Sequence, residues 1–403
     1  MTFWKQPLSY LLNMILTWFR GLGLSESLTM VIEVVVGAFL MVMVTMLFVI
    51  FLIWYERKLI GRFQDRFGPN RLGPWGVFQP FADMLKIFTK EYITPQGADL
   101  FAYNLAPALM VGAVLMIWAA IPLSSAFAAA NLSNGVLYLF AVSGFAAVAI
   151  ILAGWGSNNK YSLLAGLRAV AQLVTFEVPH ILTALIPVMF AGTLNLMDLS
   201  RSQTIWNAFL VPAAALLFLL TSLAEIGRAP FDLVEAESEL IGGFNTEYSG
   251  LKFGMFFVGE FLHAFTSSLV FAVFFLGGWN GPGAEAIPAL GFIYLIVKTF
   301  IVYFVMIWFR GTNLRFRIDQ MLGFSWKFMT PLAIAMLIVA AIVNKLVIDS
   351  HWVIRLLLVA GTNIVTLLIF NYLLSKNLKT KKVPPASSID RPVAKPDNVF
   401  TES

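Results

Sequence analysis

The sequence predicts an all-α fold: a polytopic membrane helix bundle of about nine transmembrane helices preceded by an N-terminal interfacial helix. Two observations predict it. Hydrophobic residues make up 59% of the chain and charged residues only 12%, and the apolar residues gather in stretches long enough to cross a bilayer. A water-soluble domain of this length needs far more polar surface to cover its core. Lipid is therefore the expected solvent of most of this chain.

The first element, residues 1–30, is expected to lie at the membrane surface. Its apolar stretch from Leu8 to Phe19 is short, and Trp4 and Trp18 carry the amphipathic rings that anchor a helix at an interface. The stretch lacks a strongly basic start and a small-residue cleavage site, so it does not fit a cleavable signal.

The transmembrane bundle is expected over residues 31–375. A spanning helix needs about 20 mostly apolar residues. The stretches that meet this requirement are 31–55, 101–122, 135–155, 169–192, 206–227, 253–279, 287–309, 326–346 and 352–374. Leu100 to Asn159 contains no charged residue, but Pro122 to Asn134 is rich in Pro, Ser and Asn, which favours two spans joined by a loop.

Basic residues mark alternate loops. They follow the first, third, fifth and seventh spans and fill the tail, residues 376–403, which we expect to be flexible. Basic loops face the cytoplasm, which predicts an outer N-terminus and a cytoplasmic C-terminus. The basic residues do not cluster on one helix face, so no nucleic-acid partner is expected. The chain has no cysteine, which excludes thiolate metal sites and iron–sulfur clusters held by this chain, and we expect no metal site.

Ionisable residues interrupt several spans. Glu177, Glu225 and Glu260 lie in or at the ends of three successive spans, and Lys298 lies within the seventh. Such residues are costly in hydrocarbon and often carry ions or protons. The alternative is that Glu177, Glu260 and Lys298 form ion pairs that only hold helices together. The excess of acid over base favours a functional role. His263 shares a helix face with Glu260 and could relay protons, although a buried histidine is more often a hydrogen-bonded core residue.

The connection from Tyr55 to Asp99 is unusually long and carries seven basic residues. Its GPNRLGPWG segment imposes turns. The following FADMLKIF has apolar residues at helical spacing, which predicts an interfacial helix with Phe81, Met84, Leu85 and Phe88 on one stripe. Such a loop can frame an opening between lipid and protein.

The loop from Arg228 to Lys252 is acidic although it lies on the basic side. Its acidic residues are Asp232, Glu235, Glu237, Glu239 and Glu247. A helix that begins near Pro230 would place Asp232, Glu235 and Glu239 on one face. Such a face needs a basic partner or a shared proton. The alternative is an ordinary solvated acidic loop.

Long motifs in this order resemble the first subunit of respiratory complex I, which is the H subunit of bacterial NADH:quinone oxidoreductases. The resemblance runs from about Tyr55 through Leu332. It rests on YERKLIGRFQDRFGPNRLGPWG, QPFADMLKIFTKE, AGWGSNNKYSLLAGLRAVAQ, FEVP, LAEIGRAPFDLVEAESELIGGFNTEYSG, FFVGEF and RIDQMLGFSWK.

The resemblance implies a membrane subunit of a proton-translocating oxidoreductase that is not catalytic alone. Its substrate is a quinone, and its partners are other membrane-arm subunits, the cluster-bearing hydrophilic-arm subunits and membrane lipid. The residues that match the quinone chamber are Glu56, Arg57, Arg66, Arg315 and Arg317. Those that match the proton path are Glu177, Glu225, Asp232, Glu235, Glu237, Glu239 and Glu260.

Three other functions are compatible with parts of the pattern. A membrane-bound hydrogenase subunit is the nearest, but the GPNR loop and the RIDQ arginines favour the quinone class. A secondary ion transporter would show a repeated half, and no such repeat is evident. A purely structural scaffold would lose assembly rather than activity when single glutamates change. A bacterial inner membrane is the expected location.

Overall fold

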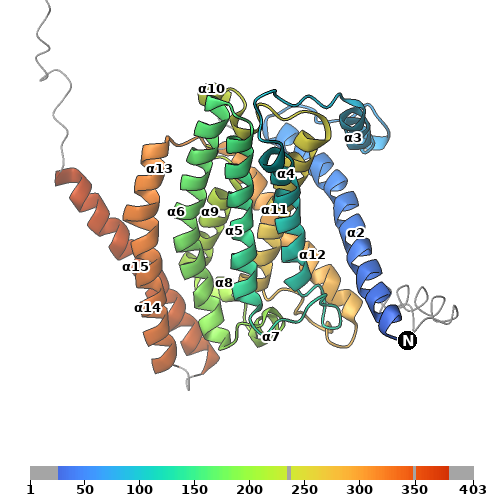
Figure 1. Cartoon of the computed structure of the whole chain (residues 1–403). Coiled ribbons are helices and arrows are strands. Elements are labelled where there is room, and N and C mark those ends of the chain that lie inside the picture. The colour runs from blue at the N-terminus through green and yellow to red at the C-terminus, as the bar shows by residue number, and fades with distance from the viewer. Residues whose placement is uncertain (1–25, 234–236, 348–350, 381–403) are drawn as a thin grey trace, which may run out of the picture.

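The computed structural model describes residues 26–233, 237–347 and 351–380. Within these ranges the chain is helical and has no β-strand, and its long helices run side by side as a bundle (Figure 1). Eight of the helices are long and apolar enough to cross a membrane. The predicted all-α polytopic bundle is confirmed. The interfacial helix expected in residues 1–30 lies outside the described residues, except that the first long helix begins at Glu26.

The spanning helices follow the predicted order. They are α2 (Glu26–Phe63), α4 (Leu100–Ala120), α5 (Gly135–Gly156), α6 (Lys160–Ala191), α11 (Gly250–Phe275), α12 (Pro288–Thr312), α13 (Ile318–Phe324) continued through a π turn (Ser325–Met329) into α14 (Thr330–Leu346), and α15 (Trp352–Thr380). The shorter helices are α3 (Gln79–Thr89), α7 (Leu196–Ser202), α8 (Asn207–Leu210), α9 (Pro212–Ile226) and α10 (Glu237–Leu240), with 3₁₀ turns at Pro74–Gly76 and Gly243–Asn245.

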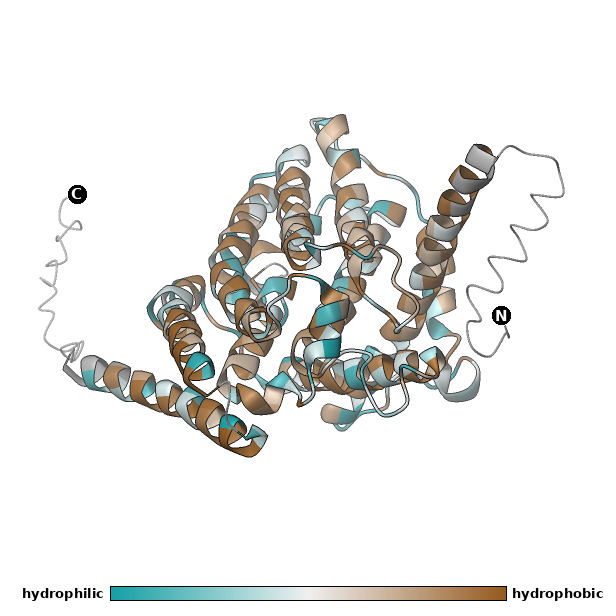
Figure 2. Ribbon diagram, turned by 90° about the horizontal axis from the view of Figure 1, so that it is seen from below, coloured by the Kyte–Doolittle hydropathy of each residue, from teal (hydrophilic) through white to brown (hydrophobic). Residues whose placement is uncertain are grey.

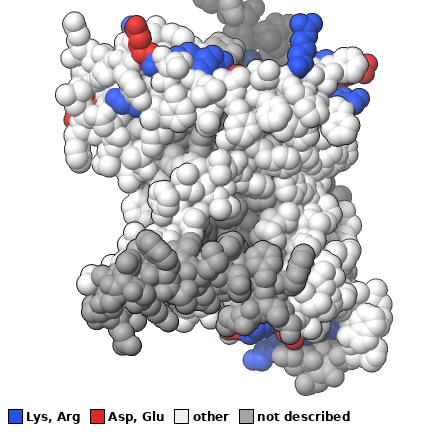
Figure 3. Space-filling view, turned by 90° about the vertical axis from the view of Figure 1, so that its right-hand side faces the viewer, with Lys and Arg blue, Asp and Glu red and all other residues white. Residues whose placement is uncertain are grey.

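On the surface of the bundle, charged side chains gather at the two ends. On the face shown in Figure 3, Lys, Arg, Asp and Glu gather at the top and bottom, and a broad band of other residues separates them. The loops that follow α2, α5, α9 and α12 all lie at the end that carries α3 and α10 (Figure 1). These are the loops that the sequence marks as basic, so the alternation along the chain is a real separation in space.

The helices differ in how much of their surface the rest of the chain covers. α11 is the most buried span, whereas α2 and α15 are the least buried and lie at opposite edges of the bundle (Figures 1 and 2). A helix that is apolar all round is stable at such an edge only against lipid or another membrane subunit. α11 is thus the core helix.

The fifth expected span, residues 206–227, is broken rather than continuous. Val211 has non-helical dihedral angles between α8 and α9, and Pro212, which follows it, has no N–H to extend the helix. The N–H groups of Ala213 and Ala214 bond instead to Oδ1 of Asn363 on α15, at 2.9 and 3.2 Å. Asn363 is 2% exposed, so a side chain from the last span caps the broken span.

The predicted interfacial helix is α3. Phe81, Leu85 and Phe88 are exposed on one stripe, and Met84 on the same stripe is half-buried. On another face, Ile87 lies so close to Gly254 of α11 that a Cβ at Gly254 would be 2.9 Å from the Ile87 Cγ2 atom. α3 therefore packs on the bundle through a small residue and presents its apolar stripe outward.

Candidate functional site

Glu56 of α2 is the meeting point of three side chains from elsewhere in the bundle. Its carboxylate is 1% exposed. The Nη1 atom of Arg228 donates a hydrogen bond to Oε2 at 2.5 Å, and the Tyr303 hydroxyl donates to the same oxygen at 2.7 Å. Arg310 of α12 donates to Oε1. Two cations and a phenol therefore satisfy both oxygens of a carboxylate that water does not reach.

Local structure at the end of α9 places Arg228 in this cluster. Gly227 takes a left-handed conformation (φ 73°) and ends the helix, which glycine does without the steric cost of a Cβ. The chain then turns inward, and Arg228 is 3% exposed. The side chain of Gln172 fixes this turn, because its Nε2 atom donates to the carbonyl oxygens of Ala224 and Phe231 at 2.7 and 2.6 Å.

Arg228 also reaches a second carboxylate. Its Nε atom lies 3.6 Å from Oε1 of Glu260 on α11, and its guanidinium lies over the ring of Phe261 at 5.0 Å. Glu56, Arg228 and Glu260 thus form one connected row from α2 to α11. With Arg310 added, two carboxylates and two guanidinium groups balance each other.

A small cavity continues this row into the bundle. It has a volume of about 30 Å³, and Glu260, His263, Glu225 and Asn245 contribute its polar lining. About 10–15 Å³ holds one water molecule, so the cavity has room for about two. Water in this position would have the polar partners that a buried water needs.

Glu225 and His180 form the inner part of the site. The Nε2 atom of His180 lies 3.0 Å from Oε2 of Glu225, and its Nδ1 atom lies 2.9 Å from the Thr221 hydroxyl. A second cavity of about 20 Å³ is lined by Ser143, His180, Glu225 and His263. His263 and Glu225 line both cavities, so they join them.

Glu177 lies beside this inner part but is not bonded into it. Its side chain is half-buried and close enough for its charge to act on Glu225. Glu225 and Glu260 line the same cavity, and Glu177 lies outside it on the side of Glu225. Lys298, which could have paired with Glu177 or Glu260, instead donates to the carbonyl oxygens of Gly278 and Asn280 at 2.9 and 2.8 Å.

The acidic loop is not helical over residues 230–233, where a helix that places Asp232, Glu235 and Glu239 on one face would begin. Phe231 and Leu233 are each 1% exposed, and burying these two side chains draws the backbone out of a helical path. Helical structure in the described part of this loop before α11 is limited to α10, four residues long, and the 3₁₀ turn at Gly243–Asn245. Glu235 lies outside the described residues, as does the side chain of Glu237. Asp232 is half-buried and interacts with other groups of the chain.

Glu239 has the basic partners that its loop required. Its carboxylate pairs with Arg168 at 2.7 Å and with Arg315 at 3.2 Å. These three side chains connect α10, α6 and the segment before α13 on the basic end of the bundle. Arg317, in the same segment, is exposed.

Arg57 and Arg66 lie apart from the Glu56 cluster. Arg57 pairs with Asp83 of α3 at 2.5 Å, and Arg66 is exposed and donates to the side chain of Gln64 at 2.8 Å. The five residues matched to the quinone chamber therefore share one end of the bundle but do not converge on one point.

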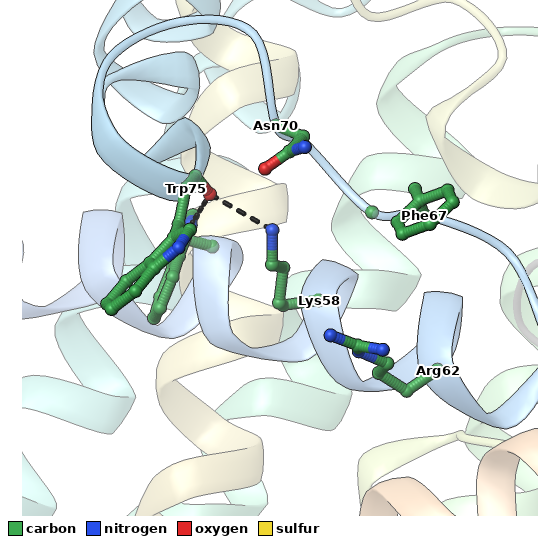
Figure 4. A pocket seen from close by; sticks show the side chains of 7 residues that line it. Lys58, Arg62, Phe67, Asn70 and Trp75 are labelled. Atoms are coloured by element: carbon green, nitrogen blue, oxygen red, sulfur yellow. Dashed lines mark hydrogen bonds between the residues drawn. The ribbon is translucent and has the colours of Figure 1, made fainter.

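A larger pocket lies between α2 and the GPNRLGPWG turn (Figure 4). Its volume is about 320 Å³, within the range of small-molecule sites. The Nζ atom of Lys58 donates to the carbonyl oxygens of Pro69 and Trp75 at 2.8 and 3.1 Å, which holds the turn over the helix. The pocket is lined by Trp54, Lys58, Arg62, Phe67, Gly68, Asn70 and Trp75.

Sequence reasoning did not assign a role to four residues that the structure places at the centre. They are Arg228, Tyr303, Arg310 and His180. In the sequence, Arg228 and Arg310 stood out only as basic residues just beyond apolar spans, His180 only as a histidine inside one, and Tyr303 not at all. Within the described residues, no group of three or more histidine and carboxylate side chains could hold a metal ion.

Comparison with known proteins points to one protein family. Residues 36–341 match the family model described as NADH dehydrogenase. The H subunit of the NADH-quinone oxidoreductase of Dehalococcoides mccartyi strain CBDB1 is 43% identical over 293 residues, 73% of this chain and 82% of the relative. The same subunit of Brevibacillus brevis is 39% identical over 77% of this chain and 92% of its own length. The H subunit of Rhodospirillum centenum is 42% identical over 76% of this chain and 93% of its own length. The chain therefore belongs to the NADH dehydrogenase family of membrane proteins that includes the H subunit of NADH-quinone oxidoreductase.

Proposed function

We propose that this chain is the membrane subunit of a complex I-type oxidoreductase that helps to form the quinone chamber and passes protons away from it. One observation carries the proposal. Ionisable groups run without interruption from Glu56 through Arg228, Glu260 and a water-sized cavity to Glu225 and His180. Each step is a direct contact or a shared cavity.

The two ends of this row have different tasks. Glu56, between Arg228 and Arg310, is held as a carboxylate and keeps the positive charges in place. His263, Glu225 and His180 line small cavities, so their imidazole and carboxyl groups can exchange protons with each other and with water in these cavities. We assign the proton transfer to this inner part.

Quinone reduction supplies the driving event. Two electrons come from a cluster in a partner subunit, and two protons join the two carbonyl oxygens to give the quinol. An anion about 10 Å from a carboxyl group, at an effective dielectric constant of about 20, interacts with it by about 1.7 kcal/mol. That is about 1.2 pKa units, enough to change the protonation of a group whose pKa is near the ambient pH.

The pocket beside α2 is the route by which we expect the quinone to enter. It is framed by the first long loop, it is lined by the aromatic rings of Trp54, Phe67 and Trp75, and α2 lies at the edge of the bundle (Figure 1). Aromatic and apolar linings with a few polar groups are typical of small-molecule sites. The names of the relatives, which contain quinone oxidoreductase, support this class over a hydrogenase.

The basic end of the bundle is where we expect the hydrophilic-arm subunits to dock. It presents the Glu239, Arg168 and Arg315 group together with exposed Arg66 and Arg317. Because basic loops face the cytoplasm, we place this end and the C-terminus inside a bacterial inner membrane and the start of α2 outside. Other membrane-arm subunits would cover lateral surface that is apolar.

Glu225→Gln and Glu177→Gln test the proton path. The variants keep the side-chain volume but remove the acidic proton, and we expect proton translocation per quinone reduced to fall by about tenfold or more. Proton uptake would be measured in vesicles that contain the whole oxidoreductase. Glu285→Gln, an equal change at an exposed residue of the opposite end, is the control. Unchanged translocation in both test variants would remove the proposed path.

A photo-reactive quinone tests the entry route independently. We expect it to label peptides that contain Trp54, Phe67 or Trp75 in the whole oxidoreductase, and unmodified quinone to compete with the label. Labelling of partner subunits alone, with none on this chain, would contradict the quinone role and favour a hydrogenase-type protein.

A further inference from the structure

A second polar pocket lies at the end of the bundle opposite the basic loops. It is formed where the start of α15 meets the end of α6 and the connection between α7 and α8, and it has a volume of about 190 Å³. Its lining residues are Phe190, Ala191, Ser202, Gln203, Thr204, Ile205, Asn207, Leu210, Trp352 and Arg355. None of them belongs to the row of ionisable groups described above.

Arg355 gives this pocket its chemical character. It lies one turn inside the last span, and its Nη2 atom donates to Oδ1 of Asn344 on α14 at 2.8 Å. Its Nε atom is shielded from solvent and has no hydrogen-bond partner in the described part of the chain. A guanidinium near the hydrocarbon with an unused donor is costly unless an acceptor reaches it. The pocket that Arg355 lines is the space from which such an acceptor can come.

The surroundings favour an anion that carries apolar groups. Arg355 places a cation at the pocket, and none of the residues that line it is acidic. The Thr204 side chain contributes a hydroxyl to the lining. Phe190, Ile205 and Leu210 supply an apolar wall beside these groups.

The position of the pocket selects between two sources of such an anion. α15 is the least buried span and lies at the edge of the bundle (Figure 1), so the pocket adjoins the lipid. Trp352, 58% exposed, is the type of residue that lies at the level of lipid headgroups. The phosphodiester of a phospholipid at this level can accept a hydrogen bond from the guanidinium while the acyl chains of the same lipid follow α15. Free phosphate has no apolar group that could contact the apolar wall.

From these observations we infer that the pocket binds the phosphodiester headgroup of a bilayer phospholipid, with Arg355 as the principal donor. Arginine suits this ligand because its planar group donates to two phosphate oxygens at once. The lipid would then fill the groove between α15 and the rest of the bundle and help to hold the last span in place. This inference stands whether or not the chain carries protons or quinone.

The test measures phospholipid retained by the whole oxidoreductase. Wild type and Arg355→Gln would be purified in detergent, mixed with vesicles of phosphatidylcholine and spin-labelled phosphatidylglycerol, and compared for immobilised lipid. Arg355→Gln loses a charge-assisted hydrogen bond, so we expect about a tenfold or greater loss of affinity for one lipid site. The control is Lys327→Gln, which also removes one positive charge. Lys327 lies in the π turn before α14, far from the pocket at the other end of α14, so this variant should retain wild-type binding.

Two further measurements keep the outcome decisive if Arg355→Gln fails to assemble. Arg355→Lys keeps the charge but loses the planar pair of donors, and Thr204→Val loses only a hydroxyl; both should weaken retention by less than Arg355→Gln. Inorganic phosphate at millimolar concentration should not displace the labelled lipid. Equal lipid retention in all variants, or displacement by inorganic phosphate, would overturn the proposal.

Discussion

Glu56 and Glu225 are both carboxylates inside the bundle, but their neighbours differ. Glu56 is bonded to two guanidinium groups and a tyrosine and has no adjoining cavity among those described. Glu225 is bonded to a histidine and lines two cavities. The first carboxylate has fixed cations as partners, and the second has a partner that can itself gain or lose a proton.

The difference teaches how one membrane protein can hold charge for two purposes. Removing one member of a buried ion pair leaves its partner uncompensated, so such a pair fixes geometry. A carboxylate beside a histidine and water can instead change protonation without leaving a bare charge in hydrocarbon. Two side chains join the two regions. Arg228 contacts both Glu56 and Glu260, and Gln172 bonds to the carbonyl oxygens of Ala224 and Phe231, which flank the segment from Glu225 to Arg228.

Glu56→Ala should have the largest effect on stability. The change leaves Arg228 and Arg310 without their shared carboxylate, and we expect a loss of about 3–5 kcal/mol. The amount of assembled chain in membranes and its thermal unfolding would measure this loss. Asp83→Ala, which breaks an exposed carboxylate–arginine pair at the same end, is the control and should change little. Equal effects of the two variants would refute the view that burial distinguishes the Glu56 cluster.

Gln172→Leu should have the second largest effect. Gln172 is fully buried, and its loss removes one donor from each of two carbonyl oxygens, which keep only their backbone bonds from Gly227 and Leu233. We expect the loss of these two bonds to cost about 1–3 kcal/mol. Because the bonds hold Glu225 and Arg228 at a fixed separation, proton translocation should fall as well. Gln203→Leu is the control, because the Gln203 side chain also donates to two buried carbonyl oxygens but lies at the opposite end of the bundle. Loss of translocation in both variants to the same degree would count against a special role for Gln172.

His180→Gln should change stability less and proton transfer more. Glutamine can still hydrogen-bond to Glu225 or Thr221, so the free energy of unfolding should change by about 1 kcal/mol. It cannot take up a proton, so translocation per quinone reduced should fall by about tenfold. Thr221→Val removes the bond at Nδ1 but keeps the imidazole, and it should retain more translocation than His180→Gln. The reverse order would show that His180 only positions Glu225.

The Arg57–Asp83 pair should have the smallest effect and a defined pH dependence. Partial burial of Asp83 raises its pKa, but the hydrogen bond and the charge of Arg57 outweigh this and hold the pKa below its usual value, with help from Lys86. The pair therefore stabilises the fold above the pKa of an unfolded aspartate, and this contribution disappears as the pH falls through the lower pKa of the folded state. Arg57→Gln should reduce the free energy of unfolding by about 0–1 kcal/mol at neutral pH, and the difference from wild type should vanish in acid.

Much of the fold could be predicted from the sequence because hydrocarbon allows few solutions. Apolar length sets the spans, basic loops set which ends lie together, and helical spacing identified α3 and its outer stripe. The break at Val211 was not predicted, because apolar residues continue through it and a proline is also common inside membrane helices. The non-helical start of the acidic loop could not be predicted, because the spacing of charges does not reveal that Phe231 and Leu233 are buried.

The candidate site was predicted in part for a related reason. Burial of charge in a span marks Glu177, Glu225 and Glu260 as unusual in any membrane protein. The Glu56 cluster was not predicted, because its members are distant in sequence: Arg228, Tyr303 and Arg310 are 172, 247 and 254 residues from Glu56. No local spacing rule relates such positions, and only the packing of α2 against α11 and α12 brings them together.

The cap that Asn363 places on α9 has a consequence for how the last span is assembled. Leucine and valine side chains on a lipid-facing helix would allow it to rotate or slide with little penalty, because lipid is as apolar as a neighbouring helix. The Asn363 amide oxygen, which accepts from two backbone N–H groups, prevents such movement. A shift of α15 by one residue would leave both N–H groups without an acceptor in an apolar environment. One asparagine thus sets the rotation of the whole helix about its axis and its depth in the membrane.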